Sequence, residues 1–282
     1  MTARLLSLSL LSCWLVLVPL RALPAADVSI ASKTFTESYV LGEIAAQLLE
    51  SEGFSVERQL GLGGTLVAFE ALKAGSIDLY PEYTGTLTQA VLGRPGLDHQ
   101  QLVQALSSLG LEIKVRLGFE NSYAIGIGEA VARQNGLQRI SDLAQQPDLR
   151  AGFSHEFLNR EDGWPELREA YQLTHQPIGI EHALAYGAIE AGQLDFTDAY
   201  TTDGELAARN LVLLEDDRDF FPEYNAVLLG RADMPADIAA ALSKLEGLLS
   251  EATMQGLNHA VASGGESPAA VASAFLRERG LV

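Results

Sequence analysis

The sequence is poor in cysteine and in basic residues. Cys13 is the single cysteine of the 282 residues, so neither an intramolecular disulfide nor a cysteine-based zinc cluster can form. Lysine and arginine number 19 against 37 aspartates and glutamates, which gives a formal net charge of −18. A chain this acidic repels the phosphate backbone of nucleic acids. These shortages exclude a disulfide scaffold and argue against a nucleic-acid partner.

Long apolar runs are also scarce, and the one present lies near the N-terminus. Arg4 precedes an apolar run over residues 5–20, and small residues follow it as far as Ala26. This order of a positive charge, an apolar run and small residues is typical of a secretory signal peptide. The run of 16 residues is shorter than the about 20 apolar residues that a membrane span needs, so a membrane anchor is less favoured. Cys13 lies inside the run, whereas a lipidated cysteine would begin a polar tether, so a lipid anchor is the less favoured alternative. We predict a signal peptide over residues 1–26 and a periplasmic mature protein.

The remaining chain has a globular composition, with 48% hydrophobic residues, 26 glycines and 10 prolines. Apolar periodicities and glycine stops predict strands that alternate with helices in its first part, which favours an α/β fold with mainly parallel sheet. The expected strands cover residues 28–31, 54–60 and 77–80, and the expected helices cover residues 36–52, 65–74, 235–249 and 267–279.

The chain contains one internal repeat. Residues 68–84 match residues 185–201 at a constant offset of 117, with seven identical pairs among 17. Each copy reads as a helix, a glycine stop and a short strand that ends near Tyr83 or Tyr200. Ligands of open α/β sheets lie at the carboxyl ends of strands. The repeat therefore predicts two similar α/β lobes, each presenting a tyrosine to a binding site.

Signatures of enzymes are incomplete. His155 and Glu156 lack the second histidine of a zinc-protease helix, and no Gly-x-Ser-x-Gly elbow is present. The glycines at 61–64 lack the Lys-Ser/Thr pair of a nucleotide-binding loop. We expect no enzyme activity, no metal and no cofactor; an enzyme built on His155, Glu156 and Asp162 is the alternative.

Six segments in order resemble the substrate-binding proteins of ABC importers for glycine betaine, choline and related osmoprotectants, and the resemblance runs from Val28 to the C-terminus. The segments are Ser32–Glu37, Gly63–Thr65, Tyr80–Thr86, Gly152–Phe157, Asn159–Gly163 and Thr197–Asp203. The resemblance implies a two-lobe periplasmic-binding-protein fold of type II with the ligand in the cleft between the lobes. We expect residues 27–118 and 213–282 in the first lobe and residues 119–212 in the second.

The resemblance also assigns binding residues. A cage of four tyrosines would surround a trimethylammonium group, three residues would hold a carboxylate, and one polar residue would border the cage. In that order they are Tyr83, Tyr123, Tyr200 and Tyr224; Lys33, Thr86 and Arg160; and Asn121. A quaternary ammonium has no N–H to donate, so aromatic faces are its natural partners. A carboxylate favours arginine, which can bind both oxygens.

The expected function is capture of glycine betaine or a related quaternary ammonium osmolyte and its delivery to the transmembrane permease subunit of an ABC importer. The binding protein is expected to act as a monomer. The tyrosine cage does not by itself distinguish glycine betaine from choline, carnitine or another betaine. A ligand-binding sensor that feeds no transporter is the second alternative.

Overall fold

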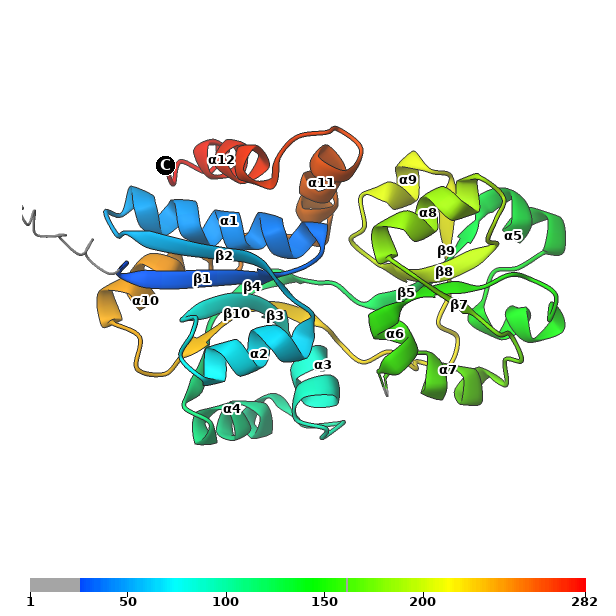
Figure 1. The fold of residues 1–282 in the computed structure, drawn as a ribbon, viewed down its shortest axis with the longest axis horizontal. Coiled ribbons are helices and arrows are strands. Elements are labelled where there is room, and N and C mark those ends of the chain that lie inside the picture. Colours follow the sequence, from blue (N-terminus) through cyan, green and yellow to red (C-terminus); the bar gives the residue numbers. More distant parts are fainter. Residues whose placement is uncertain (1–25, 161) are drawn as a thin grey trace, which may run out of the picture.

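The computed structural model describes residues 26–160 and 162–282, so the predicted signal peptide up to residue 25 lies outside the described residues. Figure 1 shows two lobes that lie side by side and are joined by extended segments. Each lobe has its own sheet flanked by helices, as the internal repeat predicted. The two-lobe α/β fold is confirmed.

The first lobe is built on a five-stranded sheet of order β2-β1-β3-β10-β4. Its strands are β1 (Val28–Lys33), β2 (Val56–Gly63), β3 (Leu79–Tyr83), β4 (Leu111–Glu120) and β10 (Asn225–Arg231). Its helices are α1 (Thr36–Ser51), α2 (Thr65–Lys73), α3 (Thr84–Thr86), α4 (His99–Ser108), α10 (Ala236–Leu242), α11 (Glu251–Ala262) and α12 (Pro268–Glu278).

The second lobe combines a three-stranded sheet of order β8-β5-β9 with the pair β6-β7. Its strands are β5 (Tyr123–Gly128), β6 (Gly152–Ser154), β7 (Ile178–Ile180), β8 (Phe196–Tyr200) and β9 (Leu211–Leu214). Its helices are α5 (Glu129–Asn135), α6 (His155–Asn159), α7 (Trp164–Tyr171), α8 (His182–Glu190) and α9 (Glu205–Ala208).

The prediction of mainly parallel sheet is wrong for the described strand pairs. The pairs β1/β2, β1/β3 and β6/β7 are parallel. In contrast, β10 is antiparallel to β3 and β4, and β5 is antiparallel to β8 and β9. The physical reason is that the chain passes between the lobes twice. The strand that returns, β10, enters the first sheet from the end at which β3 and β4 meet the second lobe (Figure 1).

The repeat corresponds to a helix–strand unit of the same length in each lobe. Helix α2 begins 117 residues before α8, at 65 and 182, and strand β3 ends 117 residues before β8, at 83 and 200. Asp78 accepts a hydrogen bond from the Ser29 N–H at 2.9 Å, and its counterpart Asp195 accepts one from the Arg150 N–H at 2.7 Å. The matched aspartates therefore tie each unit to a neighbouring segment of its own lobe.

The C-terminal helices cover the first lobe, but their bounds differ from the prediction. The helix expected over 235–249 ends at Leu242, and a 3₁₀ turn over Ser243–Leu245 follows it. Helix α11 was not predicted, whereas α12 lies within the predicted 267–279 and packs on α1. Helix α11 also reaches the second lobe, because Gln255 Nε2 donates to the Thr201 carbonyl at 3.0 Å.

The two passages between the lobes follow β4 and β9. The expected lobe boundaries at 118/119 and 212/213 fall inside these strands, each two residues before the strand ends at Glu120 and Leu214. The strands therefore place the passages at residues 121–122 and 215–224. That the expected boundaries divide the chain into two lobes that move separately stays a prediction.

Candidate functional site

All eight residues singled out from the sequence line one pocket at the junction of the lobes. The pocket has a free volume of about 20 Å³, which is room for about one water molecule. Its lining residues are Lys33, Phe35, Tyr83, Thr86, Asn121, Tyr123, Glu156, Arg160, Tyr200 and Tyr224. The structure thus brings together segments that lie up to 191 residues apart in the chain (224 minus 33).

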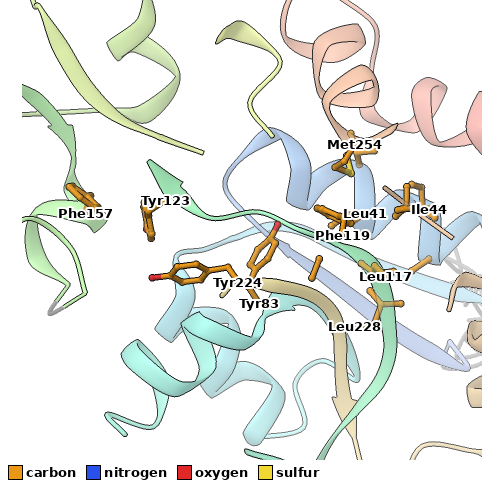
Figure 2. Close-up of a cluster of buried hydrophobic side chains, with 14 of the residues drawn as sticks. Leu41, Ile44, Tyr83, Leu117, Phe119, Tyr123, Phe157, Tyr224, Leu228 and Met254 are labelled. Carbon is orange, nitrogen blue, oxygen red and sulfur yellow. The ribbon is translucent and has the colours of Figure 1, made fainter. Parts of the chain in front are cut away.

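The four tyrosines lie at strand ends. Tyr83 and Tyr200 are the last residues of β3 and β8, Tyr123 is the first of β5, and Tyr224 directly precedes β10. Tyr123 and Tyr200 are register partners across β5 and β8, which places their ring centroids 5.1 Å apart. Tyr224 meets Tyr123 edge-on at 5.7 Å. Figure 2 shows Tyr83, Tyr123 and Tyr224 approaching one another beside the core of the first lobe.

A fifth ring, Phe35, was not predicted. Phe35 is the N-cap residue of α1, and its ring centroid lies 5.5 Å from that of Tyr200 and 6.4 Å from that of Tyr83. It therefore connects the tyrosines of the two repeat units. The available signal was an aromatic residue two positions after Lys33, at the junction of a strand and a helix.

Lys33 lies at the end of β1 and is buried. Its Nζ donates to Glu82 Oε1 at 2.7 Å and lies 5.1 Å from the ring centroid of Tyr83. An ammonium over an aromatic face is a favourable cation–π arrangement. The lysine is thus a charged donor beside the cage whose own charge is balanced by a buried carboxylate.

Arg160 is the C-cap residue of α6, and its guanidinium is buried against two acidic residues. Its Nε donates to Asp162 Oδ1 at 2.7 Å, its Nη2 donates to Asp162 Oδ2, and its Nη1 donates to Glu156 Oε1 at 3.3 Å. Its Cζ lies 5.3 Å from the ring centroid of Tyr123. The fork is therefore held rigidly with one face on a cage ring.

The sequence suggested Glu156 only as part of the alternative enzyme site, but in the structure it lines the pocket. Burial alone would raise the pKa of Glu156, but the charge of Lys33 and hydrogen bonds from Thr65 and Arg160 outweigh burial and lower that pKa. The Thr65 hydroxyl donates to Glu156 Oε1 at 2.6 Å, across the two lobes. Glu156 is therefore an ionised carboxylate that joins α2 to α6.

Asn121 lies in the first passage between the lobes, and Thr86 lies in α3. Both side chains are buried. The Asn121 Nδ2 donates to Glu37 Oε1 at 2.8 Å, whereas its Oδ1 has no hydrogen-bond partner among the described residues. A buried acceptor without a donor is costly, so this unpartnered oxygen is an unusual feature of the pocket wall.

A half-buried histidine, His182, lies next to Tyr200. The rings of His182 and Tyr200 lie 4.4 Å apart, and His182 Nε2 lies 3.0 Å from Asp203 Oδ2. Burial alone would lower the pKa of His182, but Asp203 and Asp198 raise it to about 10. The sequence offered no reason to connect this histidine with the cage.

The described part of the chain lacks two features. Over residues 26–160 and 162–282, no group of three or more histidine, cysteine, aspartate or glutamate side chains could hold a metal ion. Within the same ranges, no helix has the length and apolar character that crossing a membrane requires.

Comparison with known proteins identifies the family. The family described as the substrate-binding domain of ABC-type glycine betaine transport systems matches residues 26–278. The chain belongs to this family. It is a family of transport binding proteins and not of enzymes, so the resemblance noted in the sequence is confirmed.

Individual relatives agree with this membership. A glycine-betaine-binding protein of Pseudomonas aeruginosa is 33% identical, with 92% of this chain and 89% of the relative covered. A carnitine transport binding protein of Listeria monocytogenes is 30% identical, with 89% and 86% covered. An ergothioneine transport permease/ergothioneine binding protein of Helicobacter pylori is 32% identical over 96% of this chain, which spans only 51% of that relative's length.

Solved structures confirm the type II binding-protein fold. A glycine betaine/carnitine/choline ABC transporter structure aligns with a TM-score of 0.72 at 28% identity, over 90% of this chain and 99% of its own. A glycine betaine complex of a lactococcal binding protein aligns with a TM-score of 0.66 at 11% identity, over 90% and 96% of the two chains, which supports the fold alone.

Proposed function

We propose that this protein captures a quaternary ammonium osmolyte of the glycine betaine type and delivers it to the transmembrane permease subunit of an ABC importer. The observation that carries the proposal is the convergence of Phe35 and four tyrosines from both lobes on one pocket beside Lys33 and Arg160. In this proposal the protein is exported to the periplasm, acts as a monomer and performs no catalysis.

The pocket contains complementary groups for both ends of a zwitterion. Aromatic faces attract a trimethylammonium group at about 0.5–2 kcal/mol per ring. Lys33 and Arg160 carry more N–H groups than Glu82, Asp162 and Glu156 accept, so donors remain for a ligand carboxylate. The names of the relatives mention glycine betaine, carnitine and ergothioneine. All three compounds have a trimethylammonium group and a carboxylate.

The proposal is tested by calorimetry of the mature protein against glycine betaine, proline betaine, carnitine and choline. We expect saturable binding of at least one betaine and its recovery without chemical change. Absence of binding for all four compounds would reject the proposed function, and chemical turnover of a bound compound would instead favour an enzyme.

A pocket of about 20 Å³ is too small for glycine betaine, so the lobes are expected to open to admit the ligand. Ligand binding is then expected to close them, because contacts from both sides stabilise the closed arrangement. Trp164 and Trp14 are the only tryptophans of the sequence, and removal of the signal peptide would leave Trp164 alone. A chain of aromatic contacts connects Trp164 with the cage, from Phe153 at 4.9 Å through Phe157 to Tyr123. We expect ligand to change its fluorescence and to reduce the radius of gyration; an unchanged radius at saturation would indicate a rigid, preformed pocket.

Gly85 is expected to be essential for the position of Tyr224. A Cβ atom at Gly85 would lie 2.6 Å from Tyr224 Cδ1 and 2.8 Å from the Glu223 carbonyl oxygen, so Gly85→Ala must displace this ring or its backbone. We expect Gly85→Ala to weaken glycine betaine binding by about the value of one ring, ~0.5–2 kcal/mol. Gly256→Ala in α11, where a Cβ atom has no neighbour within 4 Å, is the control and should bind normally in calorimetry. Normal binding by Gly85→Ala would remove Tyr224 from the cage.

A further inference from the structure

Glu37 is a buried carboxylate behind the cage, in the first turn of α1, and only 2% of its surface is exposed. Four side chains from four separate segments donate to it. Its Oε1 accepts from the Tyr83 hydroxyl at 2.6 Å and from Asn121 Nδ2 at 2.8 Å, and its Oε2 accepts from the Thr202 hydroxyl at 2.5 Å and from Asn258 Nδ2 at 2.8 Å.

All four donors to Glu37 are neutral, and no ion pair involving Glu37 exists within residues 26–160 and 162–282. The other carboxylates of the site differ, since Glu82 pairs with Lys33, and Glu156 and Asp162 pair with Arg160. An ionised carboxylate accepts about four hydrogen bonds, and here all four positions are filled. Burial raises the pKa of Glu37, and the four hydrogen bonds, which lower it, do not cancel that rise.

A buried anion without a nearby cation is destabilising, and a cation that enters its surroundings removes part of that cost. Two donors to Glu37 are themselves residues of the pocket. Tyr83 donates its hydroxyl, and a phenol that donates to a carboxylate gains electron density on its ring, which strengthens attraction for a cation. Asn121 commits its amide N–H to Glu37, which leaves its unpartnered oxygen as the negative end of a dipole that can attract a cation.

We propose that Glu37 is a specificity-determining residue that acts, through Tyr83 and Asn121, as the counter-charge for a quaternary ammonium in the cage. This inference rests on the proposed function and adds to it a reason for selecting a positive headgroup over a neutral group of the same shape. The cage rings alone distinguish such groups less strongly, because a tert-butyl group also gains by burial against aromatic faces.

The decisive experiment compares glycine betaine with 3,3-dimethylbutanoate, in which carbon replaces the ammonium nitrogen while shape and carboxylate are retained. Calorimetry measures both compounds on the wild type and on Glu37→Gln, which keeps the size of the side chain and removes its charge. We expect Glu37→Gln to weaken glycine betaine about tenfold, the scale of one charge interaction across a partly shielded site. The affinity for 3,3-dimethylbutanoate should change by less than about twofold, because its tert-butyl group, which would occupy the cage, carries no charge.

Glu43→Gln is the matched control, because Glu43 is also a buried carboxylate of α1 but pairs with Arg58, away from the cage. Tyr83→Phe is the second variant and decides the matter if Glu37→Gln does not fold. It keeps the ring and removes the hydroxyl that connects the ring to Glu37. We expect Tyr83→Phe to lower the ratio of the two affinities severalfold, by selective loss of glycine betaine.

The outcomes are distinct. If the variants lose affinity for both compounds equally, or lose none, the affinity ratio stays unchanged. That result would show that Glu37 is only structural and would overturn the inference while the proposed function stands. A wild type that binds none of glycine betaine, proline betaine, carnitine and choline would overturn the proposed function and this inference together.

Discussion

Replacing Tyr83 or Tyr200 with alanine is expected to weaken glycine betaine binding by ~0.5–2 kcal/mol each, because each substitution removes one aromatic face from the cation. The two residues occupy matched positions of the repeat, at the ends of β3 and β8, and Phe35 lies between their rings. The double variant is expected to lose about 1–4 kcal/mol, up to about a thousandfold in affinity, if the two losses add.

Calorimetry on the folded variants tests this prediction. Phenylalanine at either position should be tolerated better than alanine, since it keeps the ring face. Tyr39→Ala is the matched control, because Tyr39 is a half-buried tyrosine of α1 that packs near Gly61 and does not line the pocket. Normal binding by both Tyr83→Ala and Tyr200→Ala would show that the cage assignment is wrong.

Glycine betaine is expected to bind at least about tenfold more tightly than choline, and Arg160→Ala is expected to erase most of this preference. The reason is that choline lacks the carboxylate, and a lost charge-assisted hydrogen bond is worth ~1.5–3 kcal/mol, or about 10- to 100-fold. Lys33 and Arg160 line the pocket from opposite lobes, so a carboxylate bound by both would also hold the lobes together.

The contacts of Arg160 determine how this experiment must be controlled. Alanine at 160 would leave Asp162 without its cation and Glu156 with only the charge of Lys33. Loss of one partner of a buried pair destabilises a fold by ~3–5 kcal/mol. Thermal unfolding must therefore accompany each binding measurement. Arg160→Lys retains the charge but not the two-pronged geometry, so it should keep part of the preference. Arg209→Ala, which removes an arginine paired with Glu190 in the same lobe, should keep all of it.

Two results would contradict the assignment of Arg160. The first is equal affinity of the wild type for glycine betaine and choline. The second is a folded Arg160→Ala protein that keeps the full preference. Either result would remove Arg160 from carboxylate recognition while the tyrosine cage could still bind the ammonium group.

The internal repeat is the feature of the sequence that carries the most information about the fold. It predicted two helix–strand units and a tyrosine at the end of each strand, and α2–β3 and α8–β8 match at the expected offset. Local signals suffice for such units, because apolar periodicity and glycine stops act within about a dozen residues. The same signals missed α11 and extended the helix expected from 235 too far, since helix ends depend on capping contacts.

The direction of the strands and the residues that border the tyrosine cage could not be predicted from local sequence patterns. The antiparallel course of β10 follows from the chain's second passage between the lobes, which no local pattern encodes. Phe35 and Glu156 lie inside recognised segments, but nothing in their neighbours showed that they border the pocket.

The sequence by itself predicted the two α/β units from its repeat, and its resemblance to a known family implied the eight residues that line the pocket. Only the tertiary structure decided which charges meet there. Glu37 contacts Tyr83, Asn121, Thr202 and Asn258, which stand 46, 84, 165 and 221 residues away in the chain. Whether a buried carboxylate is balanced by a cation, as Glu82 is, or only by neutral donors, as Glu37 is, depends on which segments fold against it. That balance of burial and pairing is a property of the packed molecule.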